Sequence, residues 1–192
     1  MKKFLIAALM VASFATAQAQ QPVGTVSIQP KVGFNLASLT KFDDTSMRAA
    51  VVTGAEGMYQ VSDIFGLSAG LLYSQQGVDF DGDAAYKLDY LNIPLMANVY
   101  VAKGFALKVG IQPGFMINDN IKDYSITLLD YKISTDDGLK KFDFSIPVGL
   151  SYEFANFVFD ARYNFGVTDV FDWNDAPKNS VFQFTFGYKF VL

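Results

Sequence analysis

The chain of 192 residues contains no cysteine and no histidine. Without cysteine, an exported protein of this size has no disulfide bonds. Zinc and copper sites usually need histidine or cysteine, and serine-type lipases, acyl transferases and aspartate-type membrane proteases use histidine as proton carrier. We therefore expect no cofactor, no such metal centre and no enzymatic activity. A pair of carboxylates, as in glycosidases, is the catalytic alternative that this composition leaves open.

Basic residues and long apolar runs are also scarce. Lysine and arginine number 15 against 19 acidic residues; without Lys2 and Lys3, 13 basic residues remain and the formal charge is −6. A nucleic-acid-binding protein would need a basic face, so nucleic acid is not expected as a partner. After residue 20, no stretch of eighteen apolar residues predicts a transmembrane helix.

The N-terminal segment has the pattern of a secretory signal peptide. Two lysines precede an apolar run from Phe4 to Phe14, and Ala17 and Ala19 occupy the −3 and −1 positions of an A-x-A cleavage site. We expect residues 1–19 to be removed after export, with cleavage after Ala17 as the alternative. Residues 20–192 would then form one domain.

After this segment, apolar residues recur at every second position in eight stretches. These stretches are residues 25–37, 48–61, 65–77, 88–101, 105–117, 141–154, 157–167 and 180–192. Alternate side chains of a strand point to opposite faces, so each stretch predicts a strand with one apolar face. Of the 19 phenylalanines, two lie in the signal peptide and three in loops, and the other 14 all belong to the apolar face.

The opposite face is rich in glycine and carries the charges of these strands. The charged residues are Lys31, Arg48, Glu56, Lys108, Lys141, Asp143, Glu153, Asp160, Arg162 and Lys189. Eight strands can close into a barrel whose interior is just wide enough for side chains. The bulky apolar set would not fit inside, whereas small residues with a few long charged ones would. The sequence therefore predicts an all-β, eight-stranded antiparallel up-and-down transmembrane β-barrel, apolar outside and polar inside. A soluble two-sheet sandwich that buries the aromatic face is the alternative.

Connection lengths favour the membrane barrel. Short connections at 62–64, 102–104 and 155–156 alternate with long ones at 38–47, 78–87, 118–140 and 168–179. Outer-membrane barrels keep short turns in the periplasm and long loops outside. We therefore predict a protein of the outer membrane of a Gram-negative bacterium, surrounded by outer-membrane lipid, with both termini in the periplasm.

Several short motifs resemble the PorT-like outer-membrane β-barrel domain family of Bacteroidota. They are Tyr90–Leu95, Gly149–Phe154, Asp160–Asn164 and Gly187–Phe190. The resemblance covers nearly the whole chain after the signal peptide and implies location and fold, without active-site residues; one branch of the family is associated with protein secretion. The aromatic ending resembles the C-terminal signal read by the barrel-assembly machinery, although Phe190 is third from the end. The residues of this signal are Phe182, Phe184, Phe186, Tyr188 and Phe190. The resemblance implies that the assembly machinery and periplasmic chaperones are partners during biogenesis.

The charged interior residues are the main candidate site. Buried charges are expensive unless paired, so we expect a lumen charge network of Lys31, Arg48, Glu56, Lys108, Asp143, Glu153, Asp160, Arg162 and Lys189, with Lys189 and Asp160 as one pair. Such a network would plug a narrow barrel. The alternative is an ion-conducting or proton-conducting lumen.

The loops offer two further candidates. Asp79, Asp81 and Asp83 alternate in a DFDGD stretch that suits calcium, but the remainder of an EF-hand loop is missing, so solvated acids are the simpler interpretation. The loop 118–140 is rich in isoleucine, leucine and tyrosine; it is a candidate surface for a surface or secretion-system partner, or it packs over the barrel mouth. The predicted function is therefore non-enzymatic: structural, or surface interaction through loops. A narrow porin-like channel and an outer-membrane secretion component are the alternatives.

Overall fold

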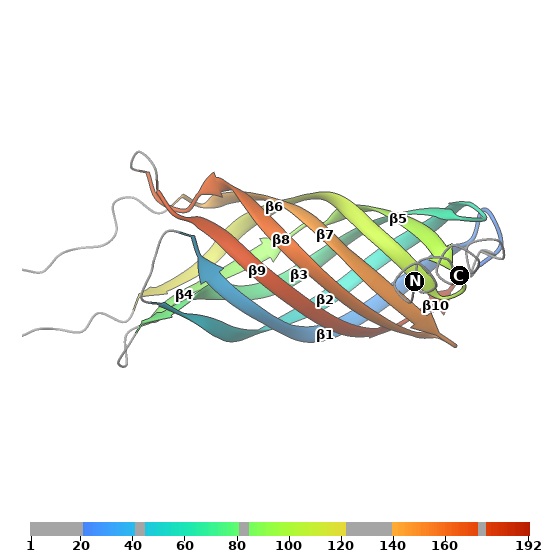
Figure 1. The fold of residues 1–192 in the computed structure, drawn as a ribbon, viewed down its shortest axis with the longest axis horizontal. Helices are drawn as coiled ribbons and strands as arrows, with labels where there is room; N and C mark the ends of the chain where they lie inside the picture. Colours follow the sequence, from blue (N-terminus) through green and yellow to red (C-terminus); the bar gives the residue numbers. More distant parts are fainter. Residues whose placement is uncertain (1–20, 41–44, 81–84, 122–139, 173–175) are drawn as a thin grey trace, which may run out of the picture.

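The computed structural model describes residues 21–40, 45–80, 85–121, 140–172 and 176–192. Within them, one sheet contains every strand and each pairing is antiparallel. The strands are β1 (Val26–Leu39), β2 (Thr45–Ser62), β3 (Phe65–Phe80), β4 (Ala85–Asn92), β5 (Leu95–Ala102), β6 (Phe105–Ile121), β7 (Phe142–Phe154), β8 (Phe157–Asp169), β9 (Lys178–Tyr188) and β10 (Phe190–Val191). Because β1 pairs with β2 on one side and with β9 and β10 on the other, the sheet closes into a cylinder (Figure 1).

Two of the eight spanning strands are interrupted. Strands β4 and β5 are separated by Ile93 and Pro94, because proline has no N–H to donate to the ladder. Pro94 still accepts a hydrogen bond from the N–H of Gly70, and the N–H of Ile93 donates to Pro113. Strands β9 and β10 are separated by Lys189 alone. The predicted eight-stranded antiparallel barrel is therefore confirmed, with these two interruptions.

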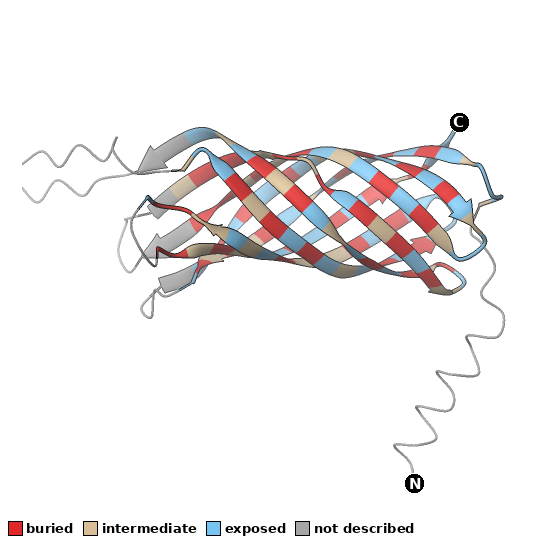
Figure 2. Ribbon diagram, turned by 90° about the horizontal axis from the view of Figure 1, so that it is seen from above, coloured by how far each residue is buried: buried red, intermediate tan, exposed pale blue. Residues whose placement is uncertain are grey.

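Burial alternates along the spanning strands (Figure 2), except at Gln76–Gly77 in β3 and Leu88–Tyr90 in β4, where consecutive residues are buried. Phe159 and Phe184 are 52% and 38% exposed, whereas Glu56 and Gln183 are almost completely buried. The bulky apolar side chains thus form the outside of the cylinder, and the sandwich alternative is wrong because one closed sheet has no second sheet to pack against.

Interior glycines let neighbouring backbones approach closely, and they also leave room for long side chains. A Cβ added at Gly33 would lie 1.9 Å from the carbonyl oxygen of Phe184, and one at Gly149 would lie 2.4 Å from that of Ala161. These strands approach so closely that only glycine fits. Sequence reasoning had predicted small residues there only as room for charged neighbours.

The two ends of the barrel differ. At one end, two-residue turns at Asp63–Ile64, Lys103–Gly104 and Ala155–Asn156 join β2 to β3, β5 to β6 and β7 to β8. At this turn end β1 begins and β10 ends (Figure 1). The other end, the loop end, carries the longer connections, as predicted. These connections are shorter than the sequence suggested, because β2, β3 and β6 extend to 18, 16 and 17 residues.

Some sequence-based predictions lie outside the described residues. They concern the signal peptide 1–19, the end of the DFDGD stretch and residues 122–139 of the long loop. Within the described residues, no helix is long and apolar enough to cross a bilayer.

Candidate functional site

A cluster of five charged side chains lies inside the barrel. Lys31 projects from β1, Glu56 from β2, Lys108 from β6, and Asp160 and Arg162 from β8. All five side chains are between 0% and 4% exposed. They lie on the inner face because each occupies the inward phase of its strand, flanked by outward-facing apolar residues.

The five side chains form one continuous ion-pair network, the central cluster. Arg162 donates from Nη2 to Glu56 Oε1 at 2.7 Å and from Nε to Asp160 Oδ1 at 2.8 Å. Lys31 Nζ lies 2.9 Å from Glu56 Oε2. Lys108 Nζ lies 2.5 Å from Asp160 Oδ2 and 3.5 Å from Glu56 Oε2. Since β6 is separated from β2 and from β8 by other strands, Lys108 reaches across the lumen to join both carboxylates.

A second polar group lies near the turn end. The Lys189 ammonium forms an ion pair with the Glu153 carboxylate, and the Tyr100 hydroxyl donates to Glu153 Oε1 at 2.9 Å. Tyr100 also packs with Met58 and Ala106 in a small apolar cluster. These side chains occupy the lumen between the central cluster and the two-residue turns.

A buried apolar group, the apolar cap, lies at the loop end of the barrel. Its buried members come from β1, from β4 and from the connection between β8 and β9; they are Leu39, Leu88, Tyr90, Val170, Phe171 and Ala176. Below it, Asn179 donates to Asp143 at 3.0 Å and to the Tyr90 hydroxyl at 3.4 Å. Along its axis the lumen therefore presents an apolar, an ionic and a mixed layer.

The structure places all nine residues of the predicted lumen charge network inside the barrel and buried. Five of them form the central cluster, and Glu153 and Lys189 form the second group. Arg48 donates to the carbonyl oxygen of Gln76 at 2.5 Å. Asp143 accepts from Thr168 and Asn179.

Two details of the prediction are wrong. Lys141 precedes β7 and is exposed, so it does not share the interior with the other strand charges. Lys189 pairs with Glu153 and not with Asp160. The register explains this: Asp160 lies opposite Thr185, whereas Lys189 follows the Phe157–Tyr188 pair beside the β7–β8 turn.

Sequence reasoning missed the apolar cap. Leu88 and Tyr90 occupy inward positions, and the sequence shows this as a reversal of the apolar phase between Leu88 and Leu91. Val170 and Phe171 lie in a connection, where period two gives no signal. Asp89 was also missed: it lies in the outward phase and is nearly buried, accepting hydrogen bonds from Tyr73 at 2.9 Å and Asn118 at 3.1 Å.

The charged residues of the lumen are held in ion pairs. The Glu56 and Asp160 carboxylates each form ion pairs with lysine and arginine side chains, so neither is free to act as general base or nucleophile. Within the described part of the chain, no three residues that commonly bind metals lie together.

The comparisons with known proteins agree with this architecture. The sequence profile of the outer membrane protein β-barrel domain family matches residues 16–172. The chain belongs to this family. No curated protein matches at a significant level.

Solved structures of small outer-membrane barrels share the fold of this family member. The attachment invasion locus protein Ail of Yersinia pestis superposes with a TM-score of 0.52 at 14% identity, covering 88% of this chain and 100% of that one. Ail bound to the heparin analogue sucrose octasulfate superposes with a TM-score of 0.51 at the same identity and coverage. Neisserial surface protein A superposes with a TM-score of 0.51 at 10% identity, covering 86% of this chain and 97% of that one.

Membership in the family places the barrel in the outer membrane of a Gram-negative bacterium, with its apolar outer face in lipid. Outer-membrane barrels keep short turns in the periplasm and long loops outside. A charge on the lipid face is costly near the bilayer midplane. On the outward phase of β4, the Asp89 carboxylate is bonded to Tyr73 and Asn118 near the loop end.

Proposed function

We propose that this family member is a non-conducting outer-membrane barrel with a plugged lumen, acting as a structural or surface-interaction protein through its loop end. It would have no enzymatic activity and no cofactor. The observation that carries this proposal is Lys108 crossing the lumen to Glu56 and Asp160.

Three layers support a closed lumen. The apolar cap presents mostly apolar side chains to a hydrated ion, and its one hydroxyl, that of Tyr90, is bonded to Asn179. The central cluster would have to lose several buried ion pairs to let one pass, and unpaired buried charges are costly. The Tyr100–Glu153–Lys189 group forms a third obstacle towards the periplasm.

Single-channel recording on the refolded protein in planar bilayers tests this. We expect no stable unitary conductance. Heat-modifiable gel migration of the same sample shows that the protein is folded, so that an absence of conductance is not due to unfolded protein. Unitary currents of porin size would overturn the proposal and favour the alternative of a narrow channel.

The loop end supplies the surface for interaction. Lys140 and Lys178 reach this surface and lie 3.8 Å from Asp172 and 4.0 Å from Asp169, and Lys141 is exposed beside them. Ail is called an attachment invasion locus protein and was crystallised with a heparin analogue; at 14% identity this supports a surface role without identifying a ligand.

Labelling of intact cells with a membrane-impermeant amine reagent tests the orientation. We expect Lys140, Lys141 and Lys178 to react, and Lys103 in the β5–β6 turn to react only after the outer membrane is permeabilised. Preferential labelling of Lys103 in intact cells would reverse the orientation and remove the surface role.

Biogenesis follows from the same proposal. The signal peptide would be cleaved after Ala19, and the assembly machinery would read the last strand, where Phe182, Phe184, Phe186 and Phe190 face outward. The PorT-like motifs support membership of the PorT-like family of Bacteroidota. Co-purification with secretion proteins would instead favour the secretion-component alternative.

A further inference from the structure

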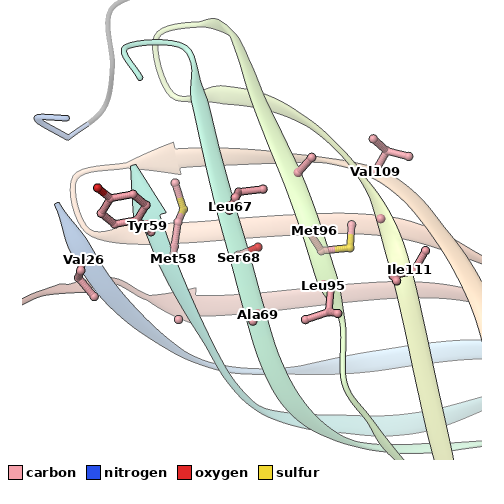
Figure 3. A pocket seen from close by; sticks show the side chains of 13 residues that line it. Val26, Met58, Tyr59, Leu67, Ser68, Ala69, Leu95, Met96, Val109 and Ile111 are labelled. Carbon is pink, nitrogen blue, oxygen red and sulfur yellow. The ribbon is translucent and has the colours of Figure 1, made fainter. Parts of the chain in front are cut away.

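A hollow of about 670 Å³ indents the lipid-facing surface of the barrel over β2, β3, β5 and β6, with Val26 of β1 at its edge. Figure 3 shows its lining on β1, β2, β3, β5 and β6. We propose that this hollow is a binding site for one acyl chain of a phospholipid from the periplasmic leaflet.

The hollow results from small residues in neighbouring positions. Gly57 on β2 pairs with Ala69 on β3, and the next row contains Ala97 on β5. Larger side chains surround this floor; they are Val26, Tyr59, Leu67, Leu95, Val109 and Ile111. The surrounding side chains are between 42% and 49% exposed, so they stand out from the wall while the floor stays low.

The lining determines the chemistry of the occupant. The exposed surface of the hollow is almost entirely apolar, and this side of the barrel lies in the membrane, so the occupant is a hydrocarbon. Its volume lies within the roughly 300–1,000 Å³ range of small-molecule sites. A flexible chain that fills the hollow gains dispersion contacts with the floor that a chain lying across its rim does not.

The position of the hollow selects the leaflet. Tyr59 pairs with Leu67, only a few residues from the Asp63–Ile64 turn. With the turn end in the periplasm, as proposed above, the hollow opens in the periplasmic half of the lipid belt, where the acyl chains belong to phospholipids. Tyr59 at its rim suits the boundary between chains and headgroups, where tyrosine is enriched.

A second copy of the barrel fits the hollow less well. Two cylinders are both convex where they meet, so contact with a neighbour leaves a concave floor unfilled. A second outer hollow, of about 310 Å³, is walled by rings that include Phe34, Phe159 and Phe184 and is less than half as large. It gives an internal comparison.

Photolabelling tests the site in the folded protein. The protein would be reconstituted in vesicles of phosphatidylethanolamine and phosphatidylglycerol containing a phosphatidylethanolamine with a diazirine on its acyl chain, and adducts mapped by mass spectrometry. Leu95 and Ile111 are 42% and 45% exposed, and Ile146 and Val148, outside both hollows, are 40% and 44% exposed. We expect about tenfold more label on the first pair, equivalent to a preference of 1.4 kcal/mol.

Filling the floor sharpens the result. Ala69→Leu should reduce the label on Leu95 and Ile111 to the level of Ile146. Ala49→Leu, which adds the same side chain to an exposed outer position away from the hollow, should leave the label unchanged. Equal labelling of both residue pairs in the unmodified protein would show ordinary surrounding lipid and overturn the proposal, whatever the variants do.

Protection of the hollow together with cross-links between copies would also overturn the proposal, in favour of a dimer. Bilayer recording is independent of these outcomes, because the hollow lies outside the lumen.

Discussion

The half of the barrel around the closing seam differs from the half opposite it. At the seam, rings contact one another across strands on the outside: Phe34 and Phe184 stack at 5.2 Å, and Phe159 and Phe186 lie 4.9 Å apart. Inside, β1, β2 and β8 supply four of the five charges of the central cluster. The opposite half has the aliphatic hollow outside and contributes only Lys108 to that cluster.

The difference follows the order of the chain. In the far half, each strand pairs with one nearby in sequence, so hairpins form with little loss of chain entropy. The seam joins Lys31 to Gly187, residues from opposite ends of the chain. Bringing distant segments together has an entropic cost that only the contacts made on closure offset. The ring contacts outside and the ion pairs inside are both concentrated at the seam, where this entropic cost arises.

The largest effect is expected at Arg162. Its guanidinium joins Glu56 on β2 to Asp160 on β8, across the seam. In Arg162→Leu both carboxylates lose a partner while buried, so the free energy of unfolding should fall by about 3–5 kcal/mol. Urea unfolding in vesicles, followed by gel mobility, measures it. Arg162→Lys keeps the charge but not the planar fork and should lose less. A loss in the free energy of unfolding no larger than the ~1 kcal/mol of an exposed ion pair would show that the central cluster does not stabilise the closed barrel.

A backbone comparison comes next. Gly33→Ala places a methyl group against the Phe184 carbonyl, which must move, and should cost about 1–3 kcal/mol. At Gly57, on the outer face of β2, the nearest atom to an added Cβ is 3.8 Å away, so Gly57→Ala should change stability by no more than about 0.5 kcal/mol. Equal losses for both variants in the same urea assay would contradict the close approach of the Gly33 and Phe184 backbones.

The smallest expected difference concerns the rings. Phe184→Ala removes the stacked partner of Phe34, whereas Leu67→Ala removes a side chain that faces lipid beside the hollow. A double-mutant cycle on Phe34 and Phe184 should give a coupling of about 0.5–1.5 kcal/mol. A matched cycle on Leu67 and Tyr59 should give less. If the two couplings agree, aromatic pairing does not distinguish the seam.

Much of the fold could be predicted from the sequence because lipid imposes a simple pattern. Every outward position within the lipid belt must be apolar. Phe144, Phe159 and Phe184 therefore each lie at the same alternate positions as the other apolar residues of their strand. The break at Pro94 and the strand extensions beyond the membrane could not be predicted in this way. Outside lipid, either phase can be polar, and the end of a strand depends on its neighbour's backbone.

The candidate site was predictable by residue but not by partner. The inward phase identified Glu56, Asp160 and Lys189 as interior. It did not give their heights along the barrel axis, which depend on strand tilt and register. Lys189 therefore meets Glu153, four positions before Phe157 begins β8. The apolar cap could not be predicted for a related reason. Val170 and Phe171 belong to the connection between β8 and β9, whose position depends on the tertiary structure of the barrel.

The sequence by itself determined which side chains face lipid and which face inward, because strand geometry alternates them whatever the register. Only the tertiary structure decided which inward groups meet and where the outer wall is hollow. Both depend on how neighbouring strands are aligned along their length, and that alignment is set by the closure of the whole sheet.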